Sequence, residues 1–164
     1  MAQNHIWEFT NQRKLNKKDF ITYFEKKVFK TIRKYEMLPK TKIFKIKKQN
    51  DVNTIILKKI LETKFQVKYS KISNISSENS SDAAEQIFQN ILQGKFKGPS
   101  PKDKISRPLY FHSDKEIEVY SKLTQSKGAK PKRNKKVQNL FKKFLNKNQD
   151  LELNITKALE QIKT

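Results

Sequence analysis

The segment between Lys42 and Leu61 constrains the fold more than any other part of the chain. It reads KIFKIKKQNDVNTIILKKIL, an apolar run typical of a strand, then a polar turn, then an apolar run typical of a helix. A phosphate-binding loop between a strand and a helix needs small residues, because its backbone N–H groups must approach phosphate oxygens closely. The turn at Lys47–Val52 contains no glycine. The order of elements in this segment is therefore that of a nucleotide-binding enzyme. The missing glycines, however, favour a binding protein over a catalyst.

The neighbouring segments predict an α/β fold. A second strand is expected at Gln66–Ile72, and the order strand, helix, strand is typical of a parallel βαβ unit. Upstream, apolar residues at helical spacing predict a helix over about 17–36. A further short strand is expected at Arg107–Phe111.

Helices are expected in the second half of the chain. Asp82 and Glu85 have the spacing of a capping box ahead of a helix that Gly94 ends, and Ser113 and Glu116 repeat that spacing ahead of another helix. Two apolar stripes at helical spacing predict two closing helices, which we interpret as core packing. The stripes are Val137, Leu140, Phe141, Phe144 and Leu145, then Ile155, Leu159 and Ile162.

The charge of the chain indicates a polyanionic partner. Lys and Arg number 37 against 16 Asp and Glu, so the net charge is +21 over 164 residues, the length of one ordinary domain. An excess of this size favours nucleic acid. Compositional drift is the alternative, since Lys, Asn and Ile are all abundant, but drift does not easily explain the scarcity of acidic residues.

The cations predicted to contact nucleic acid come from the helix at 17–36, from Arg107, and from the basic run 126–136, SKGAKPKRNKK, which we expect to be flexible. They are Lys26, Lys27, Lys30, Arg33, Lys34, Arg107, Lys127, Lys130, Lys132, Arg133, Lys135 and Lys136. A charged helix face is usually only solvated. We interpret the helix at 17–36 as a phosphate-contacting face because few acidic residues lie near its cations. Trp7, Tyr110 and Phe111 are candidates to stack on an unpaired base, with core packing as the favoured alternative.

Several classes of chemistry are excluded by composition. The chain has no cysteine, which excludes disulfides, cysteine-ligated zinc, iron–sulfur clusters and thiol catalysis. His5 and His112 lack the spacing of metal ligands. No apolar stretch is long enough to span a membrane, and the N-terminus lacks the apolar region of a signal peptide. We therefore expect a cytoplasmic protein with no cofactor, no metal and no membrane contact.

Four stretches carry a family resemblance. FITYFEKKVFKTIRKYEML at 20–38 is similar to a basic helix, and 42–61 lies where a strand, an SGGKDS loop and a helix would stand. SENSSDAAEQIFQNILQG at 77–94 is similar to a GHNLDDEAQTILMNLLRG-like segment, and RPLYFHSDKEIEVYSKL at 107–123 to a KPL…EKEVALYAYL region. Together they resemble the TtuA-type family of PP-loop tRNA 2-thiolation enzymes. The resemblance implies a reduced PP-loop-like (adenine nucleotide alpha hydrolase-like) α/β layer, with a small parallel sheet and a helix-rich C-terminal part.

The chain departs from that family at the residues that carry its chemistry. Of SGGKDS only Asp51 remains, and of the GHNLDDEA segment Asn79 and Asp82 remain. Asn16 and Asp19 stand where a family Cys and His would be. The resemblance thus implies at most a vestigial ATP site at Asp51, Asn79 and Asp82, and each of these is also a common turn or helix-cap residue.

The resemblance also suggests an organisation and a function. We expect an N-terminal extension at 1–16, a degenerate PP-loop-like domain at 17–125, a basic linker at 126–136 and C-terminal helices at 137–164. The leading hypothesis is a catalytically inactive tRNA-binding homologue that serves as the partner of an active thiolation subunit, as a homo- or heterodimer. A structural adaptor or a generic basic nucleic-acid-binding protein is the alternative. A shortened enzyme completed by a partner is disfavoured by the missing glycines and cysteines.

Overall fold

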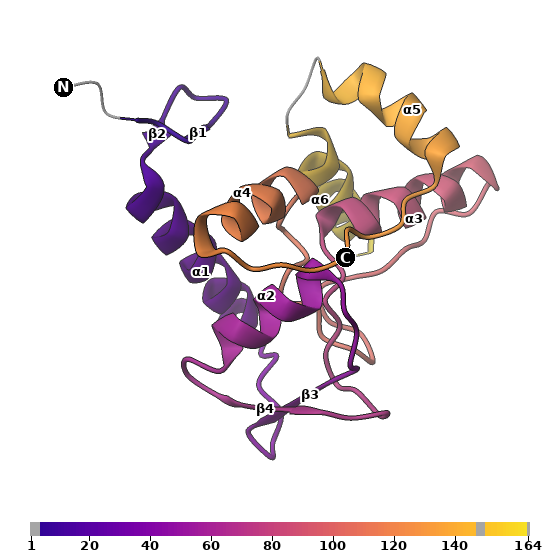
Figure 1. Ribbon diagram of the computed structural model, residues 1–164. Helices are drawn as coiled ribbons and strands as arrows, with labels where there is room; N and C mark the ends of the chain where they lie inside the picture. The colour runs from indigo at the N-terminus through magenta and orange to yellow at the C-terminus, as the bar shows by residue number, and fades with distance from the viewer. Residues whose placement is uncertain (1–3, 147–149, 164) are drawn as a thin grey trace.

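The computed structural model describes residues 4–146 and 150–163, which form two short strand pairs and a set of helices around one main core (Figure 1). In chain order the elements are β1 (Trp7–Glu8), β2 (Lys14–Leu15), α1 (Lys17–Lys34), β3 (Ile43–Ile46), α2 (Val52–Leu61), β4 (Gln66–Tyr69), α3 (Ser80–Leu92), α4 (Asp114–Thr124), α5 (Lys135–Leu145) and α6 (Leu151–Lys163). No helix in the described part of the chain is long and apolar enough to cross a membrane.

The predicted βαβ unit is confirmed. β3 and β4 pair in parallel, with Phe44 opposite Val67, and α2 connects them. β4 ends at Tyr69, three residues before the predicted end of that strand. On its other edge β3 forms a single parallel bridge from Ile46 to Ile75, which in turn bridges to Ser106 in parallel. The molecule therefore retains the order of a four-stranded parallel sheet, although only two of its strands are formed.

The side chain of Asn74 replaces part of the missing strand. Its Oδ1 accepts a hydrogen bond from the Lys45 backbone N–H at 2.7 Å, and its Nδ2 donates to the Ile43 carbonyl at 3.1 Å. The Asn74 backbone N–H donates to the Lys45 carbonyl at 2.9 Å. A side-chain amide thus satisfies ladder groups of β3 that a third strand would otherwise pair.

The predicted strand at Arg107–Phe111 is wrong. This segment forms consecutive turns, in which the Tyr110 N–H donates to the Arg107 carbonyl at 3.1 Å and the His112 N–H donates to the Leu109 carbonyl at 2.9 Å. Pro108 has no N–H to give to a ladder, which disfavours a central strand here. Leu109 and Tyr110 are apolar because they are buried in the core, not because they belong to a sheet.

Side-chain caps set where the helices begin. α3 begins at Ser80 and not at Asp82, because Asn79 is its N-cap and Asp82 is the reciprocal member of the capping box. The box predicted for α4, with Ser113 and Glu116, is confirmed.

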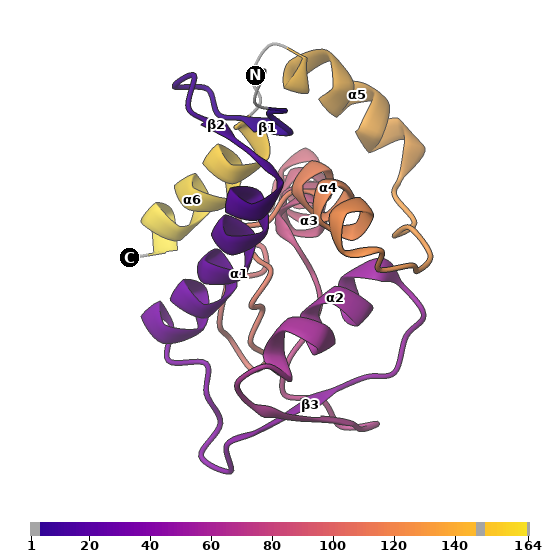
Figure 2. The same ribbon diagram turned by 60° about the vertical axis from the view of Figure 1, so that its left-hand side comes forward.

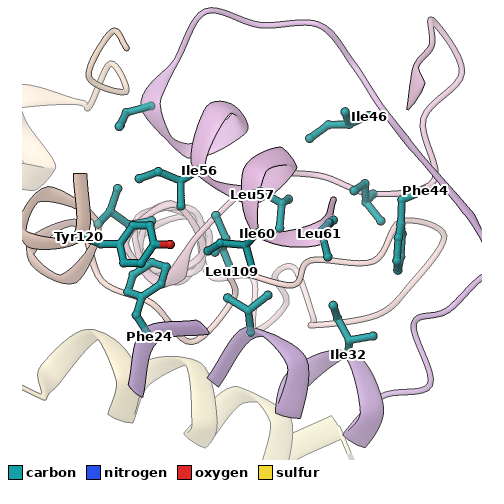
Figure 3. Packing of buried hydrophobic residues seen from close by; sticks show 14 of the residues in the cluster. Phe24, Ile32, Phe44, Ile46, Ile56, Leu57, Ile60, Leu61, Leu109 and Tyr120 are labelled. Carbon is teal, nitrogen blue, oxygen red and sulfur yellow. The ribbon is translucent and has the colours of Figure 1, made fainter. Parts of the chain in front are cut away.

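The core lies where α1, α2 and α4 meet over one face of the β3–β4 pair (Figures 2 and 3). The apolar stripe predicted for α1 is buried, and Phe24 in this stripe stacks on Tyr120 of α4 with ring centroids 4.2 Å apart. The N-terminal hairpin adds Trp7 and Leu15 to the same core. The opposite face of the β3–β4 pair is not covered by another element in either view of the described chain.

The C-terminal helices pack against α3. Val137 of α5 is buried against Ala84, and Leu159 of α6 is also buried, as their stripes predict. Leu140 is 40% exposed. The predicted core side chains of Phe141, Phe144, Leu145 and Ile162 lie outside the described residues.

Candidate nucleic-acid interface

The order of the parallel segments creates a crevice beside the N-terminus of α2. From β3 the chain first passes to β4 on one side and then to Ile75 on the other, so the strand order reverses at β3. In open α/β sheets, ligands bind at such a switch point, outside the carboxyl ends of the strands. The crevice here lies between the turn after β3 and the loop at 76–79, which is where the sequence placed the vestigial ATP site.

The basic run of the same chain lies against the N-terminus of α2 at this position. The N–H of Val52, the first residue of α2, donates to the Ala129 carbonyl at 3.0 Å, and the Ala129 N–H donates to the Asn50 carbonyl at 2.9 Å. A Cβ added to Gly128 would lie 2.7 Å from the Val52 nitrogen, so only glycine permits this approach. The basic run predicted to be flexible is therefore packed against the helix terminus that would otherwise face a phosphate.

Asp51 and Thr54 at this terminus also bond within the chain. Asp51 is the N-cap of α2, and its carboxylate accepts hydrogen bonds from the Thr54 N–H and the Thr54 hydroxyl, both at 2.9 Å. The Thr54 hydroxyl and the Ser77 hydroxyl are hydrogen-bonded at 2.9 Å across the crevice. A carboxylate at this position would repel a phosphate. Asp51 therefore has the role of a helix cap.

Arg133, at the end of the same run, lies among the other two residues of the vestigial site. Its Nε and Nη2 form two hydrogen bonds with the Asp114 carboxylate, at 3.0 and 2.6 Å, and its Nη2 donates to the Asn79 Oδ1 at 3.1 Å. Its Nη1 donates to Asp82. The side chain is 7% exposed. We call Asn79, Asp82, Asp114 and Arg133 the Arg133 cluster.

The Arg133 cluster joins three segments of the chain. Asp82 belongs to α3, Asp114 to α4, and Arg133 to the basic run, so the guanidinium connects the first turns of two helices. Burial alone would lower the pKa of Arg133, but Asp114 and Asp82 outweigh it and raise that pKa. The Arg133 guanidinium therefore stays charged, although burial raises the pKa of its partner Asp82 above the ordinary value.

Arg107 and Lys27 are also paired within the molecule. Arg107 Nε lies 2.5 Å from the Glu78 carboxylate, and its Nη1 lies 2.7 Å from the Asp103 carboxylate. Lys27 Nζ lies 3.0 Å from the Glu116 carboxylate. Burial alone would raise the pKa of Glu116, but Lys27 outweighs it and that pKa is lowered. Three candidate RNA-binding cations, Arg107, Lys27 and Arg133, therefore form ion pairs with carboxylates of the same chain.

The other candidate cations are exposed. Lys26, Lys30, Arg33 and Lys34 recur at intervals of one and two turns on the solvent side of α1, and we call them the α1 cationic face. Further along, the exposed cations of the basic run and the start of α5 are Lys127, Lys130, Lys132, Lys135 and Lys136. These two groups have the geometry expected for contacts with backbone phosphates.

The aromatic side chains singled out from the sequence are largely internal. Trp7 and Tyr110 are buried, and Phe111 is half-buried against Tyr110 and Tyr35. An aromatic residue that the sequence analysis missed, Tyr69, is 47% exposed at the end of β4. Lys48 Nζ and Lys58 Nζ lie 5.9 and 5.3 Å from the centroid of its ring. The alternating pattern of β4 places Tyr69 in a strand but does not say that its ring reaches solvent.

A cavity of about 860 Å³ lies between the first turns of α3 and α4, the N-terminal hairpin and α5. Its lining includes Lys27 and Arg133 together with the carboxylates of Asp114, Glu116 and Glu152. A site for a phosphate chain needs cations without competing anions, and this lining does not have that character.

Comparison with known proteins identifies a solved structure with a similar fold. No family model and no curated protein matches the chain. Among solved structures, it is similar to the U34-tRNA thiolase NcsA from Methanococcus maripaludis, determined with its [4Fe-4S] cluster. The TM-score is 0.70 at 11% identity, and the match covers 99% of this chain and 83% of the thiolase chain.

The residues of this chain do not fit an iron–sulfur cluster. Such clusters are bound by cysteine thiolates, and this sequence has no cysteine. Asn16 is the N-cap of α1, and its Oδ1 accepts a hydrogen bond from the Asp19 N–H at 2.9 Å, so these two residues have a structural role. With its reversed strand order, its small parallel sheet and its likeness over nearly the whole chain, this protein has the fold of a PP-loop tRNA thiolase.

Proposed function

We propose that this protein is a catalytically inactive, tRNA-binding relative of the thiolases whose fold it has, and that it acts in the cytoplasm. The observation that carries the proposal is the closed crevice. The backbone of Gly128 and Ala129 lies against the N-terminus of α2, and Asp51 caps that helix. ATP would have to displace both the basic run and a carboxylate, so binding of RNA is expected to be independent of ATP.

The charge distribution supports RNA as the ligand. The net charge is +21, and the α1 cationic face presents four exposed cations on one side of a single helix. Contacts of lysine and arginine with phosphates supply affinity without sequence readout. The preference for tRNA over other polyanions is proposed from the thiolase fold.

A role beside an active thiolation subunit is the second part of the proposal. Ile91, Leu92 and Phe96, at the end of α3 and in the loop after it, are 42%, 67% and 72% exposed. Exposed apolar groups of this kind are typical of protein contacts. A structural adaptor that binds only protein is the competing function, and it requires no affinity for tRNA.

The test is a salt-titrated binding assay with tRNA and a length-matched duplex DNA, with and without ATP. If about five phosphates are neutralised, log affinity falls against log salt with a slope of roughly −3.5 to −4.5. We expect tighter binding of tRNA, unchanged by ATP. Equal binding of both polyanions would favour generic attraction, and absence of binding would favour the adaptor.

Reversing charge on the α1 cationic face should weaken RNA binding. The double variant Lys30→Glu/Arg33→Glu removes two phosphate contacts, so the magnitude of the salt slope should fall by about 1.4 to 1.8, with an affinity loss of about tenfold at moderate salt. The matched control is Lys17→Glu/Lys18→Glu, which makes the same charge change at the exposed N-terminal end of the same helix. Equal losses in the two variants would show that only total charge matters.

A further inference from the structure

The carboxyl end of the β3–β4 pair has the properties of a site for an unpaired nucleotide. We propose that Tyr69, with Lys48 and Lys58 beside its ring, stacks on an unpaired base of a single-stranded RNA segment while the two ammonium groups contact the flanking phosphates. This inference rests on the proposed RNA-binding function. It specifies that the part of the RNA recognised at this site is an unpaired base.

The first argument is the exposure of the ring. Tyr69 is the last residue of β4, and β4 lies at the edge of the sheet, because β3 makes its further contacts on the side of Ile75. Tyr69 is 47% exposed even though its strand partner, Ile46, is buried in the core. An aromatic ring at an open edge is accessible from solvent without any rearrangement of the fold.

The second argument is the pair of cations at the ring. Lys48 comes from the turn after β3 and Lys58 from α2, so two different elements place an ammonium group within 6 Å of the same ring centroid. A stacked base would take the place of an ammonium group on the ring, and that group would then lie close to the phosphates on either side of the base. Single-stranded nucleic acids are bound by this combination of an aromatic platform and nearby cations.

The third argument is the charge around the platform. Lys47 and Lys48, in the turn after β3, are both exposed, whereas Lys45 and Lys68 lie on the opposite face of the strand pair from Tyr69, because side chains alternate along a strand. Asp51 caps α2, and Glu62 pairs with Lys58, so Lys48 is the cation at the ring that has no carboxylate partner among the described residues. The surface next to Tyr69 is therefore strongly cationic and suits a polyanion.

The fourth argument is the place of the platform in the fold. Tyr69 and the turn that contains Lys48 both follow the carboxyl ends of parallel strands, the edge at which open α/β sheets bind ligands. The basic run packs against Asn50 and Val52 at the start of α2, whereas Tyr69 at the end of β4 remains exposed.

The test compares Tyr69→Ala with Tyr69→Phe in binding to a short oligouridylate and to a double-stranded RNA of the same length. Loss of a stacking ring should weaken oligouridylate binding by about five- to hundredfold, whereas Tyr69→Phe, which keeps the ring, should bind within about twofold of the unmodified protein. Binding of double-stranded RNA should be unchanged, because its bases are already stacked. Leu140→Ala, at an exposed apolar residue of α5, is the control and should have no effect.

A direct readout of stacking comes from Tyr69→Trp. The only native tryptophan, Trp7, is buried and should contribute a constant signal, so oligouridylate should quench the fluorescence of the new indole. Equal oligouridylate affinities of Tyr69→Ala and Tyr69→Phe, or absence of quenching, would overturn this inference while leaving binding of tRNA through other surfaces intact. Failure of the unmodified protein to bind any RNA would overturn the proposed function as well.

Discussion

Replacing Arg133 with alanine should lower the free energy of unfolding by about 3 kcal/mol, because it leaves the carboxylates of Asp82 and Asp114 without their cation. Both carboxylates retain some contact with water, with side chains 27% and 44% exposed, so the expected cost lies at the lower end for a broken buried pair. The measurement is urea unfolding at pH 7, followed by circular dichroism.

The matched control is Lys132→Ala, which removes an exposed cation from the adjacent position and should change stability by less than about 0.5 kcal/mol. A double-mutant cycle with Asp114→Asn separates the contact from general effects, since the two substitutions should be clearly non-additive. Trypsin should also cleave the Arg133→Ala protein faster at Lys127 and Lys132, because the run is then bound to the rest of the molecule at fewer points. A stability change below about 1 kcal/mol would show that the Arg133 cluster does not hold the run in the crevice.

Acid should destabilise the protein through His112. The ring is fully buried, its Nε2 lies 3.1 Å from the Phe24 carbonyl oxygen and must donate to it, and its Nδ1 has no hydrogen-bond partner among the described residues. Burial, together with the nearby charge of Lys27, lowers the pKa of His112 to about 3. The folded protein therefore contains a neutral imidazole across the pH range in which a histidine in an unfolded chain becomes charged.

The direction of the stability change with pH follows from proton uptake by the unfolded chain. Below the ordinary histidine pKa of about 6.5 the unfolded chain binds a proton that the folded chain does not bind, so the stability falls by about 1.4 kcal/mol per pH unit. The expected loss is about 3 kcal/mol between pH 7 and pH 4, and it ends near pH 3, where the folded state also becomes protonated.

The measurement is the free energy of unfolding from pH 7 to pH 4 for the unmodified protein and for His112→Asn, which retains a small donor near the Phe24 carbonyl. Above pH 5, where few carboxylates titrate, His112→Asn should show a much flatter profile. Parallel profiles for the two proteins would contradict a buried neutral His112. His5, which is exposed, provides the control as His5→Asn and should leave the profile unchanged.

The local elements were predictable because they depend on short-range patterns. The apolar stripe of α1, the strand–helix–strand order from Ile43 to Tyr69 and the capping box of α4 each lie within a single stretch of sequence. The errors have equally local causes. The segment at 107–111 has the composition of a strand but contains a proline, and the cap of α3 was assigned to Asp82 although Asn79 and Asp82 compete for the same spacing.

The site could be predicted only in part. The absence of glycine from the turn after β3 and of cysteine from the whole chain can be read directly from the residues, and both point away from the chemistry of a thiolase. The sequence leaves two interpretations for Asp51, Asn79 and Asp82, a vestigial ATP site or helix caps. In the structure these residues make the contacts of helix caps and of an ion-pair cluster. Tyr69 was missed because the exposure of a ring depends on which face of a strand is covered.

The sequence by itself determined the charge, the absence of cysteine and of glycine in the turn after β3, and the helix and strand periods, because each is a property of composition or of neighbours along the chain. Only the tertiary structure decided which cations are free to meet a ligand. Arg133 lies 51 residues from Asp82 and is buried in an ion pair, whereas Lys132, next to it in the chain, is exposed. Whether a lysine or arginine binds a carboxylate of its own protein or a phosphate of a partner depends on contacts between distant segments, and those contacts exist only once the chain has folded.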